Sequence, residues 1–198
     1  MSRRTRPRGR QGVRPTSGRV RDALMNSLAP RLAGSRVLDL FAGTGGLGLA
    51  MLARGARSAV FVERDQRLVE VIRQDLAKEG WADRAEVWGK DALAAVRELG
   101  RRGERFDLIL MDPPYGEGWI PKALRAIRDA KIVAPEGLIV AEGHWRDQAP
   151  LEAGFVQVRE ARYGETVLWS YIEDGGEPAL PWGSTPGAST RCISVISI

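Results

Sequence analysis

Cysteine, histidine and long apolar runs are scarce in this sequence, which contains one cysteine, Cys192, and one histidine, His144. A single cysteine excludes an internal disulfide bond and a cysteine-rich metal site. No apolar run approaches the roughly 20 residues that are needed to cross a bilayer. The N-terminus also lacks the apolar core of a secretory signal. Together these absences predict a cytoplasmic protein with no membrane segment and no metal centre.

Acidic residues are missing from residues 1–21, a stretch that carries eight arginines. The net charge of the chain is +5, so these eight charges leave −3 for the remainder. Arginines displace counterions from phosphates whatever the base sequence is. The basic stretch therefore favours a polyanionic partner, nucleic acid above all. The alternative is a tail that only improves solubility.

A length of 198 residues suits one domain with a full core. Residues 1–13 are mainly arginine, proline and glycine with little to bury, which predicts a flexible arm. Residues 175–198 are rich in glycine, proline, serine and threonine, which predicts a loose C-terminal tail. One folded domain is therefore expected at residues 14–174, and we expect it to be a monomer.

The domain is expected to begin with an amphipathic helix. Val20, Leu24 and Leu28 recur at helical spacing, and Pro30 and Gly34 are expected to close this helix.

Beyond that helix, β-rich runs alternate with helical stretches, which implies parallel pairing and a doubly wound α/β sheet. Only residues 160–165 separate the last two runs, so these strands should pair antiparallel. Seven mostly parallel strands with a terminal antiparallel strand are the Rossmann-like arrangement of class I S-adenosylmethionine-dependent methyltransferases. The expected strands are Val37–Phe41, Ala59–Glu63, Ala85–Trp88, Phe106–Met111, Leu138–Ala141, Phe155–Arg159 and Thr166–Ile172, and the expected helices are Gly46–Arg54, Gln66–Glu79, Ala92–Leu99, Ile120–Asp129 and a short one near Arg146–Glu152.

A glycine-rich turn follows the first expected strand, with glycines at 43, 45 and 48. Glycine lets the backbone turn sharply and approach a ligand closely. A Gly-x-Gly-x-x-Gly pattern alone fits a dinucleotide site equally well. Glu63 ends the second strand and fits either cofactor, because a carboxylate can accept hydrogen bonds from both ribose hydroxyls.

Three features favour S-adenosylmethionine over a dinucleotide. Asp39 ends the first strand, where a carboxylate can position the ammonium group of the ligand. Asp91 follows the third strand and can accept from an adenine amino group, although aspartate also caps helices and the two roles can coexist. The fourth strand ends in the segment 112–115, Asp-Pro-Pro-Tyr, for which hydride transfer has no use. The candidate cofactor residues are Asp39, Phe41, Gly43, Thr44, Gly45, Glu63 and Asp91.

The candidate catalytic residues are Asp112, Pro113, Pro114 and Tyr115, which suit an acceptor with an exocyclic amine. Asp112 can accept one N–H of the amine and the Pro113 carbonyl the other, which stabilises the positive charge that develops on nitrogen. Proline withholds N–H donors, and Tyr115 offers a face on which the base can stack. A strand-ending turn without chemistry is the alternative. His144 is expected to be a surface or loop residue rather than a base, and Trp119 lies close enough in sequence to wall the acceptor.

These motifs together resemble the RsmD-like family, which methylates N2 of a guanine in 16S ribosomal RNA. The resemblance runs from Arg14 to about Asp174, and its most specific part is R-P-T-S-G-R-V-R-D-A-L at 14–24. The segments 37–45 and 112–115 are shared with many amino-group methyltransferases, and residues 162–166 resemble the closing strand pair of the family. Family members usually carry a β-hairpin where this chain has the 13 residues before Arg14.

The resemblance implies that the chain transfers a methyl group from S-adenosylmethionine to guanine N2 in ribosomal RNA, either free or within a small-subunit assembly particle. It also implies that Arg14, Thr16, Arg19 and Arg21 face the RNA backbone or cover the active site. Arg19 and Arg21 on a merely solvated helix face are the alternative.

Three other functions stay open from the sequence. A DNA adenine-N6 or cytosine-N4 methyltransferase can use the same Asp-Pro-Pro-Tyr segment, but it usually needs a separate target-recognition domain. A protein-glutamine methyltransferase typically has asparagine in place of Asp112. A catalytically silent RNA-binding assembly factor is the non-enzymatic alternative, and the intact Gly43, Glu63, Asp91 and Asp112 argue against it.

Overall fold

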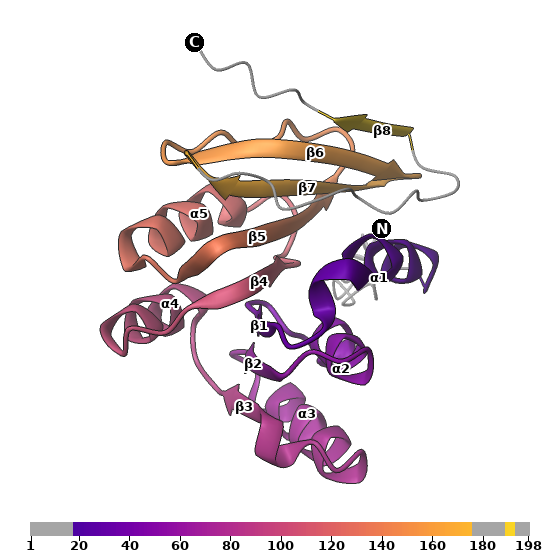
Figure 1. Cartoon of the computed structure of the whole chain (residues 1–198), viewed down its shortest axis with the longest axis vertical. Helices are drawn as coiled ribbons and strands as arrows, with labels where there is room; N and C mark the ends of the chain where they lie inside the picture. Colours follow the sequence, from indigo (N-terminus) through magenta and orange to yellow (C-terminus); the bar gives the residue numbers. More distant parts are fainter. Residues whose placement is uncertain (1–17, 176–188, 193–198) are drawn as a thin grey trace, which may run out of the picture.

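A computed structural model describes residues 18–175 and 189–192, which form an eight-stranded sheet with helices on both faces (Figure 1). The strand order is β3-β2-β1-β4-β5-β7-β6-β8. Strands β1 to β5 run parallel, whereas β7 is antiparallel to β5, and β6 is antiparallel to both β7 and β8. The elements are α1 (Gly18–Leu32), β1 (Arg36–Asp39), α2 (Gly46–Ala53), β2 (Ser58–Val62), α3 (Gln66–Lys78), the 3-10 helix η1 (Ala82–Arg84), β3 (Ala85–Trp88), α4 (Ala92–Arg101), β4 (Phe106–Met111), α5 (Trp119–Ala130), β5 (Val133–His144), β6 (Phe155–Tyr163), β7 (Thr166–Glu173) and β8 (Ser189–Cys192).

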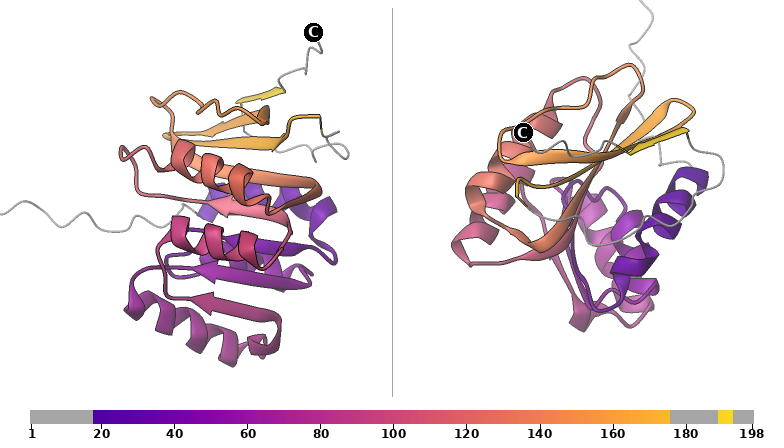
Figure 2. Two further views of the ribbon diagram at one scale, coloured as in Figure 1. Left: turned by 90° about the vertical axis from the view of Figure 1, so that its left-hand side faces the viewer. Right: turned by 45° about the horizontal axis from the view of Figure 1, so that its top comes forward.

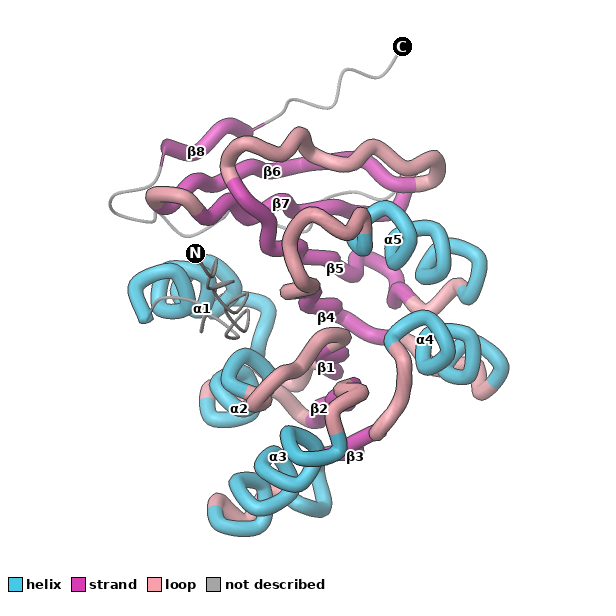
Figure 3. The backbone as a smooth tube through the Cα atoms, turned by 180° about the vertical axis from the view of Figure 1, so that it is seen from behind, coloured by secondary structure: helices cyan, strands magenta, loops and turns pink. Residues whose placement is uncertain are grey.

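The central strands are buried on both faces, as expected for a parallel sheet. Along β4, Leu108 and Leu110 pack into the core under α1, α2 and α3, whereas Ile109 and Met111 pack into the core under α4 and α5. Figures 2 and 3 show the same division of the helices between the two faces. The seven expected strands are all present, in the expected directions.

Helix α1 is longer than the sequence predicts. The expectation that Pro30 closes the helix is wrong, because Pro30 lies inside it and the helix ends at Leu32. Proline removes one backbone hydrogen bond. However, Leu28 and Leu32 on either side are 0% and 1% exposed, so burial of this last turn outweighs that cost. Gly34 follows with a φ of 75°, which ends the helix as predicted.

The short helix expected near Arg146–Glu152 is absent, so that prediction is wrong. A turn follows β5 instead, in which the Asp147 N–H donates to the His144 carbonyl at 2.9 Å. Pro150 also disfavours the helical conformation at the residue before it. The segment 145–154 therefore crosses back toward β6 as turns and irregular chain.

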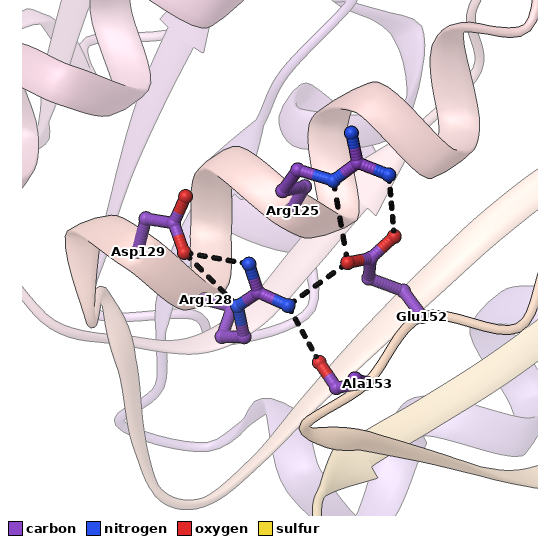
Figure 4. A network of polar contacts seen from close by, with 5 residues as sticks. All are labelled: Arg125, Arg128, Asp129, Glu152 and Ala153. Carbon is purple, nitrogen blue, oxygen red and sulfur yellow. Dashed lines mark hydrogen bonds and ion pairs between the residues drawn. The ribbon is translucent and has the colours of Figure 1, made fainter.

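Glu152 fixes this segment to α5 (Figure 4). Its carboxylate accepts hydrogen bonds from Arg128 at 2.9 Å and from Arg125 at 3.3 and 3.4 Å. Arg128 also donates to the Ala153 carbonyl at 3.0 Å and pairs with Asp129 at 2.8 Å. The end of the segment is thus held by side chains rather than by helical backbone bonds.

Strand β8 lies inside the stretch that was expected to be a loose tail, so that expectation is wrong for residues 189–192. These residues pair antiparallel with β6, from Arg159↔Cys192 to Arg162↔Ser189. Nothing in the described part of the chain forms a helix both long and apolar enough to cross a membrane.

Candidate active site

The predicted site residues meet at the carboxyl ends of the parallel strands, the edge where open α/β sheets bind ligands. Asp39 is the last residue of β1, Glu63 follows β2, and Asp112 follows β4. These three strands are neighbours in the order β2-β1-β4. Three carboxylates from distant parts of the sequence therefore share one region of the sheet edge.

The glycine turn after β1 has the conformation that its sequence predicts. Gly43 and Gly45 have φ values of 55° and 79°, in the left-handed region that favours glycine. The Gly45 N–H donates to the Ala42 carbonyl at 2.7 Å, which closes the turn directly before α2. Thr44, between the two glycines, is exposed. The turn thus presents backbone and a hydroxyl side chain beside the carboxylates.

Glu63 is oriented by two backbone donors. Its Oε2 accepts from the Gly43 N–H at 2.9 Å, and its Oε1 accepts from the Asp65 N–H at 2.8 Å. A carboxylate oxygen has a second acceptor position. Glu63 can therefore bind two hydroxyl groups of a ligand while its own position stays fixed.

Asp39 is almost fully buried, at 1% exposed. Its Oδ2 accepts a hydrogen bond from the Gly48 N–H at 2.9 Å. Burial raises the pKa of Asp39 from 3.8 to about 7; the Gly48 bond opposes this rise, and the negative charges of Asp112 and Glu63 add to it. A cationic ligand at this edge would favour the charged form of the carboxyl group.

Asp91 caps helix α4. Its Oδ1 accepts from the backbone N–H groups of Leu93 at 3.0 Å and Ala94 at 3.1 Å. The capping role that the sequence allowed is therefore present. Asp91 is exposed at the same edge of the sheet, after β3.

The segment 112–115 leaves β4 and divides into a buried and an exposed part. Asp112 is half-buried, Pro113 is buried and Pro114 is exposed, and Tyr115 is 49% exposed. The Tyr115 hydroxyl donates to Oε1 of Glu142 at 3.0 Å. Burial and the negative charge of Glu142 raise the pKa of Tyr115, so its hydroxyl remains a donor at neutral pH.

An aromatic pair connects the loop after β1 with the start of α5. The ring of Phe41, after β1, meets the ring of Trp119, at the start of α5, edge to face with centroids 5.8 Å apart. Trp119 also donates from Nε1 to Glu117 at 2.8 Å, and Lys122 lies 5.3 Å from its ring centre. The prediction that Trp119 walls the acceptor remains a prediction, and this contact supports it.

The predicted RNA-facing residues lie on α1 or before it. Arg14 and Thr16, like the side chain of Arg19, fall outside the described residues. Arg21 is exposed, and its Nη1 lies 3.7 Å from where a Cβ on Gly46 would be. The Arg21 guanidinium therefore leans over the first turn of α2, next to the glycine turn.

Sequence reasoning missed Glu142, which is 5% exposed near the end of β5. The available signal was a carboxylate directly after the apolar run 138–141, at the edge where the other site residues lie. His144 is the last residue of β5 and is half-buried, with its ring centre 6.3 Å from that of Tyr115. His144 therefore lies beside residues 112–115, the acceptor segment.

A groove between two helices lies apart from the three carboxylates. A groove of about 640 Å³ runs between α4 and α5, and its basic side chains include Arg97, Arg101, Lys122 and Arg125. Across residues 18–175 and 189–192, no group of three or more His, Cys, Asp or Glu side chains is arranged to hold a metal ion.

The chain matches known proteins over most of its length. A family model described as "Conserved hypothetical protein 95" matches residues 2–172. YlbH of Bacillus subtilis strain 168 is 34% identical over 164 residues, which cover 82% of this chain and 89% of that protein. The Escherichia coli K12 protein named "Ribosomal RNA small subunit methyltransferase D" is 33% identical over 161 residues, which cover 81% of this chain and 79% of that protein.

Solved structures agree with these matches. The Escherichia coli protein yhhF is 29% identical with a TM-score of 0.74, and the match covers 82% of this chain and 90% of that one. The structure of SMU.776, solved in complex with SAH, is 17% identical with a TM-score of 0.61, and the match covers 77% of this chain and 48% of that one. At this identity the likeness shows only a shared fold. The predicted class I methyltransferase fold and the predicted family resemblance are therefore confirmed.

Proposed function

The chain belongs to the family described as Conserved hypothetical protein 95, and from this premise we propose that it methylates the N2 amine of a guanine in 16S ribosomal RNA, with S-adenosylmethionine as the methyl donor. The observation that carries the proposal is the convergence of Asp39, Glu63 and Asp112 beside the glycine turn. The name of the Escherichia coli relative supports ribosomal RNA of the small subunit as the substrate.

The residues around the glycine turn suit this cofactor. When bound, S-adenosylmethionine supplies an electrophilic methyl group on a positively charged sulfur. Glu63, held by two backbone N–H groups, accepts hydrogen bonds from the ribose hydroxyls. Asp39 contributes the negative charge that positions the ligand's ammonium group, and Asp91 accepts from the adenine amino group. Phe41, Gly43, Thr44 and Gly45 form the wall of this half of the site.

Asp112 and Pro113 prepare the acceptor amine. The lone pair of an exocyclic amine is delocalised into the ring, which makes the nitrogen a poor nucleophile. Asp112 accepts one N–H and the Pro113 carbonyl accepts the other, which favours a tetrahedral nitrogen with its lone pair free to react. Positive charge develops on this nitrogen in the transition state, so both acceptors stabilise the transition state more than the bound substrate. The proton of the methylated amine leaves to solvent.

Tyr115 and Pro114 position the guanine ring. The hydrogen bond to Glu142 fixes the phenol, and the half-exposed ring offers a face for stacking. On the other side of the glycine turn, Arg21 contacts the RNA backbone or covers the site, together with Arg14, Thr16 and Arg19. The arginine-rich residues 1–13 add sequence-independent attraction to phosphates.

The test is methylation of ribosomal RNA from cells that lack the gene. The unaltered protein should form N2-methylguanosine at one position, located by mass mapping. Asp112→Ala should lower the rate by at least about a hundredfold, the scale for removing one group that stabilises transition-state charge. The cofactor affinity of this variant, measured by calorimetry, should stay nearly unchanged.

Asp83→Ala provides the matched control, because Asp83 is an exposed aspartate in η1. This helix directly precedes β3 and so lies at the amino ends of the parallel strands, away from the site. This control should leave both the rate and the affinity intact. Full activity of Asp112→Ala, or a product methylated on a DNA base instead, would refute the proposal.

A further inference from the structure

Trp145 is an exposed aromatic side chain that contacts two arginines, one next to it in the sequence and one from β6. The side chain is 38% exposed, although it follows a buried strand. The guanidinium of Arg162, from β6, lies 4.2 Å from the ring centre of Trp145, and that of Arg146 lies 5.1 Å away. Among the residues that the structure describes, neither arginine forms an ion pair.

This cluster of Trp145, Arg146 and Arg162 adjoins the acceptor segment. The ring centre of His144 lies 6.3 Å from that of Tyr115 and 6.0 Å from that of Trp145. The rings of Tyr115, His144 and Trp145 therefore form a row from the segment after β4, past the end of β5, to the β6–β7 turn.

Backbone bonds hold Trp145 in this place. Its N–H donates to the Glu165 carbonyl in the β6–β7 turn at 2.9 Å, and His144 pairs with Thr166 of β7. Arg162 is fixed by a bond from its Nε to the Gly164 carbonyl at 2.9 Å. The ring and the guanidinium thus come from two segments that the sheet joins at the edge of the active site.

Other tryptophan–arginine contacts in the described chain are less exposed and lie elsewhere. Trp88 packs beside Arg102 with its ring 9% exposed. Trp81 lies beside Arg84, which donates to the backbone carbonyls of Leu52 and Ala56. Those contacts stabilise the fold, whereas Trp145 is left open next to the acceptor segment.

We infer that Trp145, Arg146 and Arg162 bind the RNA nucleotide next to the methylated base. Its base stacks on the indole or on the guanidinium that lies against it, and the two arginines neutralise the adjoining phosphates. This inference rests on the proposed function, because it assigns the neighbouring nucleotide of the same substrate. It narrows the substrate to RNA in which both the target and its neighbour are unpaired or extruded from a helix.

The experiment measures binding of a fluorescein-labelled single-stranded octaadenylate by anisotropy, with the full chain. Adenylate contains no guanine, so this measurement does not depend on methylation. Trp145→Leu keeps apolar volume but removes the ring, and it should weaken binding about tenfold, the scale of one lost stacking contact. Trp145→Phe should restore binding to near that of the unaltered protein.

Trp81→Leu is the matched control, because it removes a ring beside an arginine at the amino ends of the parallel strands, away from the site. It should leave octaadenylate binding unchanged. A second pair of variants leaves Trp145 unaltered, so a folding defect of Trp145→Leu cannot decide the test. Arg162→Gln should weaken binding, whereas Arg105→Gln, which removes an exposed arginine just before β4, should not.

Three results would overturn the inference: no measurable binding of octaadenylate, equal binding by Trp145→Leu, or an adenylate–uridylate duplex that binds with the same dependence on Trp145. Failure of the guanine assignment would look different. In that case the dependence of octaadenylate binding on Trp145 would remain, while N2-methylguanosine would be absent from ribosomal RNA.

Discussion

The hydroxyl of Tyr115 donates a hydrogen bond to the buried carboxylate of Glu142, at 3.0 Å, and so joins the segment after β4 to the end of β5. The hydrogen bond serves both residues, for different reasons. Glu142 is 5% exposed and needs donors, because a buried carboxylate without hydrogen bonds is costly. Tyr115 is 49% exposed, and the bond restrains its phenol. The bond therefore orients the ring that the proposed substrate uses.

Tyr115→Phe and Tyr115→Ala separate the hydrogen bond from the ring. Tyr115→Phe removes one donor to Glu142 and should lower the free energy of unfolding by about 1–3 kcal/mol, the scale for losing a partner of a buried polar group. It keeps the stacking face but removes one restraint on its orientation, so the Michaelis constant for RNA should rise less than in Tyr115→Ala. Tyr115→Ala should raise that constant about tenfold by removing the face. Urea denaturation and steady-state kinetics provide the measurements, and equal kinetic effects of the two variants would contradict the stacking role.

Asp39→Asn should change how stability depends on pH. In the folded protein Asp39 keeps its proton up to about pH 7, whereas an ordinary aspartate loses it near 3.8. The folded state therefore binds an extra proton between these values, and the free energy of unfolding falls as the pH rises through this window. The slope from this one group is at most about 1.4 kcal/mol per pH unit. Denaturation at several pH values should show this fall in the unaltered protein and a smaller one in the variant. Parallel curves would show that Asp39 titrates normally.

Gly48→Ala should be strongly unfavourable, because a Cβ at that position would lie 2.3 Å from the Phe61 ring and 3.1 Å from Oδ2 of Asp39. Phe61 is 0% exposed and has no room to move. The expected loss of stability is about 1–3 kcal/mol, typical of overpacking in a core, with a loss of cofactor affinity because Asp39 is displaced.

Gly46→Ala is the matched control in the same helix turn. A Cβ on Gly46 would meet nothing closer than Nη1 of Arg21 at 3.7 Å. Alanine is also preferred over glycine in helices, so this variant should be as stable as the unaltered protein or more so. Thermal unfolding of the two variants tests the difference, which should vanish if the close approach at Gly48 is unimportant.

Glu152→Gln should loosen the segment 145–154. The Glu152 side chain is 9% exposed and bridges Arg125 and Arg128, and glutamine weakens both contacts. Hydrogen exchange of the backbone amides in this segment should become faster. Asp129→Asn removes a carboxylate that also binds Arg128 but is 64% exposed, and it should leave the exchange unchanged. Equal exchange in both variants would show that Glu152 does not hold the segment.

Most of the fold could be predicted because its signals are local. The run 106–111 is apolar at every position except Asp107, since β4 is buried on both faces. The turn after β1 needs glycine at 43 and 45 for its backbone conformation, and the sequence supplies it. The segment 112–115 stands out because its residue types are unusual after a buried strand.

What the sequence did not predict depends on contacts between distant segments. Residues 146–152 have some helical character, but Glu152 gains more from the arginines of α5 than from a helical turn. Pro30 was expected to end α1, and the burial of Leu32 overrides it. Glu142 went unnoticed because its importance comes from Tyr115, which is 27 residues away in the sequence.

Strand β8 changes what the molecule offers to its surroundings. The backbone amides and carbonyls along an outermost strand readily template pairing with a second chain. By pairing with β6 from Arg159 to Arg162, β8 replaces that part of the nine-residue β6 edge with an outermost strand of only four residues. At the other margin of the sheet β3 is only four residues long, and its Glu86 points a charge to solvent. Both margins of the described sheet therefore end in strands of only four residues, and such short outermost strands are poor seeds for edge-to-edge aggregation.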